Sequence, residues 1–100
     1  MEKIWLSSYQ DGVSTEVDVR QFDSIVDVFR QSTERYSGRT ALINMDKHMS
    51  FSELAETAGH FSSFLQHHLK LKRGERVAIM MPNLLQYPVA LFGILQAGMV

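Results

Sequence analysis

Hydrophobic residues recur at helical spacing in two stretches of the first seventy residues. In the first stretch the apolar residues that fall mainly on one side of a helix are Phe22, Ile25, Val26, Phe29 and Tyr36. Ser24 can cap this helix, and Asp27 complements the positive end of its dipole. Gly38 can take the left-handed position that commonly follows a helix. The pattern therefore predicts an amphipathic helix within residues 23–39.

The second stretch begins at Ser50, which stands three residues before Glu53 in the S-x-x-E pattern of a capping box. Met49 and Leu54 occupy the two positions of a hydrophobic staple. The apolar stripe that follows consists of Phe51, Leu54, Ala55, Ala58, Phe61, Leu65 and Leu69. Its helical spacing predicts a helix with one buried side, and Gly74 ends the loop after it.

Shorter segments surround these two helices. Residues 40–45, with the sequence TALINM, are typical of a strand, and residues 48–51 predict a short return strand. Asp46 and Lys47 would form the tight connection between them. Residues 1–21 mix turn formers with short β-rich pieces, so we expect an extended arm there.

The last 24 residues, from Val77 to Val100, carry no charge. A membrane span needs roughly 20 apolar residues, but Pro82 removes an amide donor and disfavours helix before it. What remains after Asn83 is short and interrupted by Gln, Pro and Gly, so a membrane span is disfavoured. The sequence instead predicts a strand at residues 77–81 and a buried helix at residues 84–98.

Two details of this region can be predicted. Asn83 can cap the helix, and Pro88 pushes its regular start toward Tyr87. The strand would have an unpaired edge, because no following strand is present to cover it. The apolar helix face that would stay uncovered includes Val89, Leu91, Phe92, Ile94 and Leu95.

Charge and composition exclude several classes of function. The net charge is −1 and the Lys and Arg residues are scattered, which disfavours nucleic acid as a partner. There is no cysteine, so the chain has neither a disulfide framework nor a thiolate metal site, which fits the cytosol. The apolar patch near the start is only Ile4, Trp5 and Leu6, too short for a secretory signal.

No residue pattern indicates catalysis. His60 and His67 would lie two helical turns apart, about 10.5 Å, which is too far for two ligands of one zinc ion. Gly93 and Gly98 have the spacing of a phosphate loop, but Met99 and Val100 follow where Lys and Ser or Thr are needed. Close packing and a helix C-cap explain these glycines better. No serine stands in a G-x-S-x-G elbow, and we predict no catalytic, cofactor-binding or metal-ligating residue.

Three segments in order resemble the N-terminal region of the adenylate-forming enzymes. They are "RYSGRTALIN", then "MSFSELAETAGHFSSFL", then "LKRGERVAIMMPNLLQYPVALFGILQAGMV". The last block, together with the opening "KIWLSSY" and "STEVD", is similar to bacterial long-chain fatty-acid–CoA ligases, also called acyl-CoA synthetases. The resemblance covers essentially the whole chain.

The resemblance implies an α/β fold in which residues 1–100 are part of a large N-terminal domain. It comprises the arm at 1–21 and an α/β fragment at 22–100 with helices, a short hairpin and the first strand and helix of a parallel sheet. Such enzymes use ATP and Mg²⁺ to convert a long-chain fatty acid to an acyl-adenylate, and then transfer the acyl group to CoA. Their phosphate loop and metal-contacting motifs lie downstream of the matched region, so the resemblance carries no site residue into this chain.

The chain stops inside a β-α-β unit, so we expect a truncated fragment that is inactive alone. The resemblance also implies a homo-oligomer in the cytoplasm, with peripheral association of the whole enzyme with the membrane. The alternative is a free-standing small α/β interaction module that binds a partner through its apolar C-terminal helix.

Overall fold

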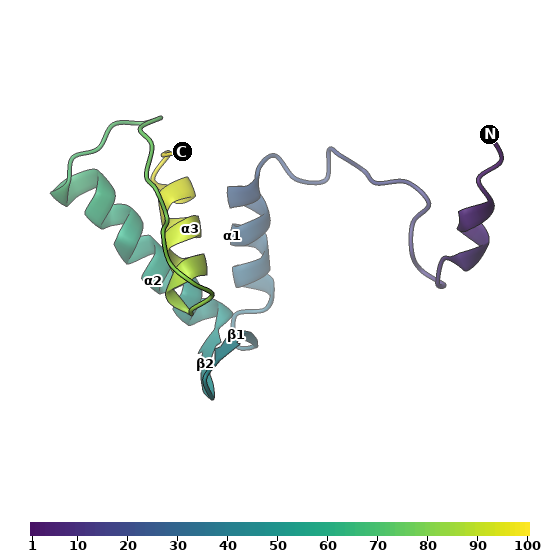
Figure 1. The fold of residues 1–100 in the computed structure, drawn as a ribbon, viewed down its shortest axis with the longest axis horizontal. Coiled ribbons are helices and arrows are strands. Elements are labelled where there is room, and N and C mark those ends of the chain that lie inside the picture. Colours follow the sequence, from purple (N-terminus) through teal and green to yellow (C-terminus); the bar gives the residue numbers. More distant parts are fainter.

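The computed structural model describes residues 1–100 and shows three α-helices side by side, with a β-hairpin at one end (Figure 1). The elements are, in order, the 3₁₀-helix η1 (Ile4–Ser8), α1 (Ile25–Arg35), β1 (Thr40–Asn44), β2 (Lys47–Ser50), α2 (Phe51–Ser63), the π-helical η2 (Phe64–His68) and α3 (Gln86–Gln96). The most extensive contact between elements is that of α2 with α3, and α1 packs against both. The predicted α/β class is confirmed.

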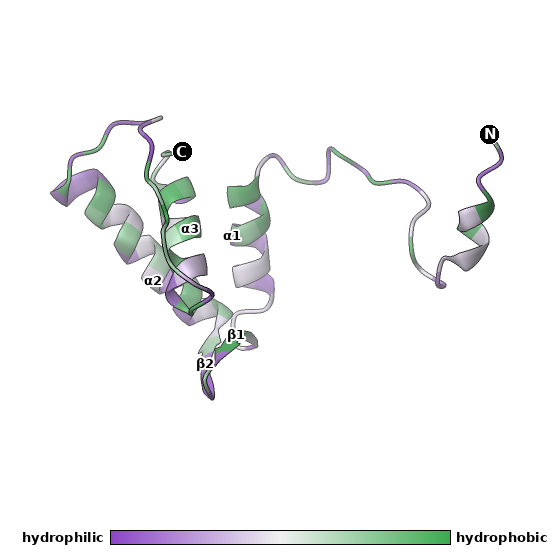
Figure 2. Ribbon diagram, in the orientation of Figure 1, coloured by the Kyte–Doolittle hydropathy of each residue, from purple (hydrophilic) through white to green (hydrophobic).

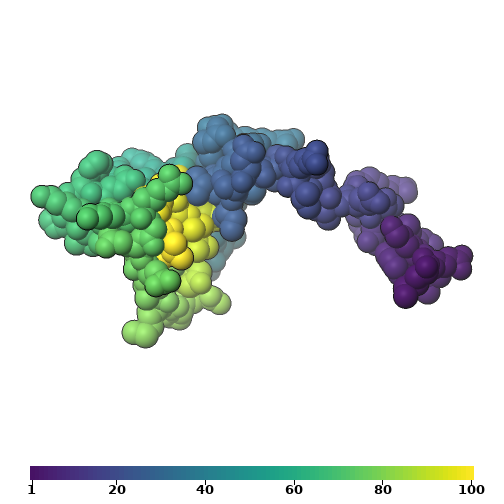
Figure 3. All heavy atoms as spheres, turned by 90° about the horizontal axis from the view of Figure 1, so that it is seen from above, coloured from purple at the N-terminus to yellow at the C-terminus, as the bar shows by residue number.

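The N-terminal arm projects away from the helices, as Figures 1 and 3 show. Its apolar side chains at Ile4, Val13, Val17 and Val19 are exposed. The one regular element of the arm is the 3₁₀-helix η1, which was not predicted, since an extended arm was expected there.

The start of α1 agrees with the sequence and its end does not. The Ser24 hydroxyl accepts a hydrogen bond from the Asp27 amide at 3.1 Å, as predicted for a cap. The expected left-handed Gly38 is wrong, because Gly38 does not have a positive φ. The chain leaves the helix through a turn in which the Arg39 amide donates to the Tyr36 carbonyl at 2.8 Å, and this turn needs no left-handed residue.

The hairpin forms with its turn one residue earlier than predicted. Asn44 pairs with Lys47, so the two turn residues are Met45 and Asp46 rather than Asp46 and Lys47. Both have positive φ, 48° and 62°, as a type I′ turn requires, and this turn matches the twist of the two strands. The Met45 side chain is exposed, so no packing opposes this register.

The capping box predicted for α2 is confirmed. The Glu53 amide donates to the Ser50 hydroxyl at 3.1 Å, and the Ser50 amide donates to the Glu53 carboxylate at 2.8 Å. Leu54, Ala58 and Leu65 of the predicted stripe are buried, whereas Leu69 is half exposed. The helix widens to π geometry from Phe64 on, with the Leu69 amide bonded to the Phe64 carbonyl, and this wider turn moves Leu69 off the stripe.

The regular part of α3 is shorter than the predicted 84–98. Asn83 does not cap it, since the N-cap is Leu85 and no side chain satisfies the first turn. The Asn83 carbonyl instead accepts a hydrogen bond from the Asn44 side-chain amide at 2.8 Å, which ties the hairpin to the loop before α3. Pro88 lies in the first turn, where its missing amide costs little.

The core consists of two adjoining clusters. The first contains Phe29, Leu54, Ala58 and Val89, and the second contains Leu65, Ile94, Ala97 and Met99. The rings of Phe29 and Phe92 stack with centroids 4.0 Å apart and join α1 to α3. The expectation that Val89 and Ile94 lie uncovered is wrong, because both belong to the core clusters; Leu91, Phe92 and Leu95 are half-buried.

The predicted strand at 77–81 is not a paired strand. No backbone hydrogen bond involves residues 78–81, and the only sheet is the antiparallel pair of β1 and β2. A strand needs a neighbour for its amides and carbonyls, and β1 and β2 pair only with each other and not with this segment. None of the helices combines the length and the apolar character needed to cross a membrane.

Candidate functional site

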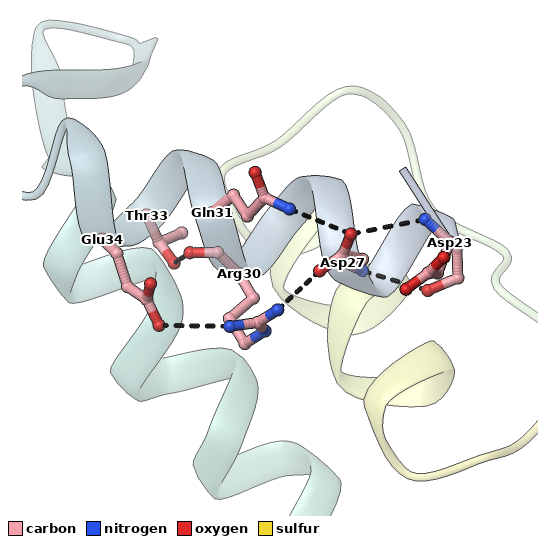
Figure 4. A network of polar contacts seen from close by, with 7 residues as sticks. Asp23, Asp27, Arg30, Gln31, Thr33 and Glu34 are labelled. Carbon is pink, nitrogen blue, oxygen red and sulfur yellow. Dashed lines mark hydrogen bonds and ion pairs between the residues drawn. The ribbon is translucent and has the colours of Figure 1, made fainter. Parts of the chain in front are cut away.

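The polar groups on the outer side of α1 form a local network (Figure 4). Asp27 accepts hydrogen bonds from the side chains of Gln31 at 3.0 Å and Arg30 at 2.6 Å, and from the Asp23 amide at 3.3 Å. The bond from Gln31 contributes most, followed by those from Arg30 and Asp23, and together they hold the pKa of Asp27 below its ordinary value. Every partner lies within four residues along the chain, so this carboxylate stabilises the helix start.

The second carboxylate with a displaced pKa is Glu53. Hydrogen bonds from the Ser50 amide and then from the Ser50 hydroxyl lower its pKa. These are the bonds of the capping box, and they occupy the carboxylate at the first turn of α2. The two carboxylates with a lowered pKa therefore both lie in the first turn of a helix, and the two helices are different.

The histidines do not come together. His60, His67 and His68 lie exposed along α2 and η2, and His48 lies exposed on β2. The His68 ring stacks on Phe64 with centroids 4.9 Å apart, which explains its position by packing. No three side chains of His, Asp or Glu converge closely enough to hold a metal ion.

The two glycines of α3 have the structural roles that the sequence indicated. A Cβ atom at Gly93 would lie 2.8 Å from the Phe61 ring and 3.0 Å from the Ala58 carbonyl, so glycine lets α3 approach α2 closely. Gly98 has φ +81°, and the Met99 amide bonds to the Ile94 carbonyl at 3.1 Å. This is the Schellman arrangement of a helix C-terminus, and both interpretations are confirmed.

An apolar groove of about 420 Å³ lies between α1, β1, the start of α2 and α3. Its floor and walls are formed mainly by Ile25, Val28, Phe29, Pro88, Leu91 and Phe92. The sequence did not reveal this groove, because its two sides are sixty residues apart and meet only through the packing of α1 on α3. The polar groups that line it are the hydroxyls of Ser32 and Tyr87, and no carboxylate, histidine, lysine or arginine is among its lining residues.

The segment before α3 returns to lie beside the end of the chain. The Val100 amide donates to the Glu75 carbonyl at 2.9 Å, and the Val77 amide donates to the Val100 carbonyl at 2.9 Å. Val100 thus bonds to the residues on either side of Arg76, and this is the hydrogen-bond pattern of two parallel strands. Residues 75–77, α3 and Val100 thus have the arrangement of a strand, a crossover helix and a parallel return, although the pairing is limited to one residue.

Comparison with known proteins gives a consistent result. The protein-family profile described as AMP-binding enzyme matches residues 29–100. A long-chain-fatty-acid–CoA ligase of Escherichia coli O157:H7 is 52% identical over 100 residues, which is 100% of this chain and 18% of the relative. The ligase of the same description from Salmonella typhimurium is 48% identical over the same shares of the two chains.

Solved structures show the same fold. The Klebsiella oxytoca NpsA N-terminal subdomain, in complex with 3-hydroxyanthranilyl-AMSN, superposes with a TM-score of 0.76 and 26% identity over 85% of this chain and 22% of that one. The artificially fused NpsA-ThdA adenylation–PCP di-domain gives a TM-score of 0.74 and 26% identity, over 80% of this chain and 15% of that one.

The chain spans about a fifth of the length of the bacterial ligases that it matches. The profile match covers well over half of the chain, and the solved relatives share its arrangement in space. This chain therefore belongs to the AMP-binding enzyme family.

Proposed function

We propose that this chain is the N-terminal part of a ligase that activates long-chain fatty acids with ATP to acyl-adenylates and transfers the acyl group to CoA. The observation that carries this proposal is the 52% identity to a long-chain-fatty-acid–CoA ligase along the entire chain. That match includes residues 1–28, which the general AMP-binding profile does not reach. The arm thus supports the fatty-acid ligases in particular, within the wider family.

In this proposal residues 1–100 supply structure and no catalytic group. Residues 22–100 form the α/β part, and residues 1–21 form the arm of one N-terminal domain. The residues present do not fit Mg²⁺. The carboxylates of Asp27 and Glu53 accept hydrogen bonds in the first turns of α1 and α2, and no three acidic or histidine side chains converge to hold a metal ion. The groups that bind ATP, Mg²⁺ and CoA belong to other parts of the whole enzyme.

The proposal extends to partners and location. The whole enzyme acts on fatty acid and CoA in the cytoplasm. It associates peripherally with the membrane and forms a homo-oligomer. Exposed apolar side chains on the arm, such as Val17 at 88% and Val19 at 83% exposure, support contacts with other molecules. The scattered basic residues support no role for nucleic acid.

A chimera tests the proposal directly. Residues 1–100 of this chain would replace the matching residues of the Escherichia coli ligase, and fatty-acid-dependent exchange of pyrophosphate into ATP would be measured. We expect the chimera to retain exchange with long-chain fatty acids, and the isolated 100-residue chain to show none.

A chimera that carries Gly93→Leu serves as the control, because a leucine there cannot fit against Phe61 and Ala58 and should abolish exchange. A chimera that is folded by circular dichroism yet inactive toward every fatty acid would contradict the assignment. Exchange by the isolated chain would contradict its purely structural role.

A further inference from the structure

Charge is distributed unevenly along the chain. Residues 1–56 contain ten acidic and six basic residues, a net charge of −4, whereas residues 57–76 contain one acidic and four basic residues, a net charge of +3. The four basic residues are Lys70, Lys72, Arg73 and Arg76, and all of them are exposed. The overall net charge of −1 therefore combines an acidic region with a short basic segment.

The basic segment lies at one end of the helices. It follows η2, and Figure 1 shows it at the end of α2 that lies away from the hairpin. Its one acidic residue is Glu75, whose carboxylate accepts a hydrogen bond from the Lys72 amide. Both ion pairs of the chain lie within α1. The positive charges of the segment are therefore not neutralised by side chains of residues 1–100.

Two apolar side chains are exposed beside these charges. Phe64 is 44% exposed and its ring stacks on that of His68, and Leu69 is 50% exposed. Leu65, which lies between them in the chain, is buried in the core. Exposed aromatic and aliphatic side chains next to basic residues are typical of protein surfaces that lie on anionic membranes.

Charge also bears on where this segment lies in the whole enzyme, of which this chain has about a fifth of the length. Lys and Arg are almost never fully buried unless they are paired. Burial of four basic residues within seven positions would require well-placed acidic partners for each of them. An apolar face has no such requirement. We therefore expect residues 70–76 to stay in contact with water in the whole enzyme.

We propose that residues 64–76, which we call the basic tip, form the surface through which the whole enzyme lies on an anionic membrane. This surface rests on the peripheral membrane association proposed above and specifies where it occurs. The basic residues contact lipid phosphates, while Phe64 and Leu69 enter the boundary between headgroups and acyl chains. These two apolar side chains favour a membrane over a nucleic-acid duplex, whose outer surface offers no apolar layer.

The test uses the chimera described above and measures its sedimentation with vesicles. Vesicles of phosphatidylcholine mixed with phosphatidylglycerol are compared with vesicles of phosphatidylcholine alone. We expect binding to the mixed vesicles, and we expect it to weaken as salt is raised, because salt screens exposed charges. Lys70→Gln combined with Lys72→Gln should weaken this binding at least about tenfold, since each basic residue near an anionic surface contributes about fivefold.

Arg39→Gln combined with Lys47→Gln is the matched control, because it removes two charges from exposed residues at the hairpin end of the helices. This variant should bind the mixed vesicles as the parent chimera does. Equal binding by the two double variants, or equal binding of the parent to both kinds of vesicle, would overturn this surface. Tighter binding to a DNA duplex than to the mixed vesicles would overturn the choice of partner.

Pyrophosphate exchange without vesicles separates this surface from the ligase assignment. Both double variants should retain the exchange of the parent chimera. Loss of exchange only with Lys70→Gln and Lys72→Gln would show that these side chains contact the rest of the enzyme, and it would overturn the surface. A parent chimera that binds the mixed vesicles through the basic tip but shows no exchange would contradict only the ligase assignment.

Discussion

Residues 24–63 and residues 75–100 each pack against the same core, but they are specified in different ways. The first region contains α1, the hairpin and α2, and both of its helices begin with a side-chain cap. In the second region α3 has no side-chain cap, and no charged residue follows Arg76. Figure 2 shows the contrast, with mixed hydropathy on α1 and α2 and a largely hydrophobic α3.

This difference shows which contacts determine where the helices of each region begin and how they are placed. The caps of α1 and α2 join residues three positions apart, so a short piece of sequence defines where these helices begin. The position of α3 depends on Gly93 meeting Phe61 and Ala58, more than thirty residues away. A substitution at a cap should therefore remove a contact between residues three positions apart. A substitution at Gly93 should disturb contacts with residues more than thirty positions away.

The largest effect is expected at the close contact of α3 with α2. Gly93→Ala places a methyl group 2.8 Å from the Phe61 ring and 3.0 Å from the Ala58 carbonyl. Overpacking of this kind should lower the free energy of unfolding by about 1–3 kcal/mol. Urea unfolding, followed by circular dichroism at low protein concentration, would measure the change.

Gly59→Ala is the same substitution in α2, at an exposed glycine with nothing within 4 Å of the new methyl group. It should stabilise the chain by about 0.5–1 kcal/mol, because alanine favours helix over glycine. The comparison of the two regions fails if both substitutions change stability in the same direction.

A smaller effect is expected at the capping box. Ser50→Ala removes the hydroxyl that accepts from the Glu53 amide, and it should cost about 0.5–2 kcal/mol of stability. Ser63→Ala, at the exposed last residue of α2, is the control and should stay within about 0.5 kcal/mol of the parent chain. Equal urea midpoints for Ser50→Ala and the parent would show that the cap does not determine the start of α2.

The smallest effect should appear in the pH dependence of stability. The pKa of Asp27 is lower in the folded chain than its ordinary value of 3.8. Its contribution is therefore complete above pH 3.8 and is lost as the pH falls through the lowered pKa. Asp27→Asn should reduce the unfolding temperature at neutral pH and leave it nearly unchanged in strong acid.

The turn residue Asp46 provides the matched control for this titration. Asp46 is exposed, so Asp46→Asn should leave the unfolding temperature at neutral pH close to that of the parent chain. A constant difference between Asp27→Asn and the parent at every pH would mean that the charge of Asp27 is not what stabilises α1.

The features that sequence reasoning predicted correctly are those defined by near neighbours. Ser24 with Asp27, and Ser50 with Glu53, satisfy amides that any helix leaves free at its start. Gly98 could be recognised as a C-cap, because an α-helix commonly ends at a glycine with positive φ. Such contacts form between residues that the chain itself holds close together.

The hairpin turn and the expected glycine stop of α1 show the limit of local patterns. Several residues near Tyr36 and near Asp46 are compatible with turns, so the local sequence does not decide between turns that differ by one residue. The register that places Met45 in the turn is selected by strand twist and by the packing of β1 and β2 beside α2.

The sequence by itself determined the order of the helices, the N-caps of α1 and α2 and the presence of the hairpin, because these depend on residues within about four positions of each other. Only the tertiary structure decided that Val89 and Ile94 enter the core, that Asn83 bonds to Asn44 instead of capping α3, and that residues 78–81 lack a partner. The uncharged residues 77–100 favour burial of every face of α3 and of the segment before it. Which side is covered therefore depends on the segments that reach it, and a strand exists only where another backbone supplies its hydrogen bonds.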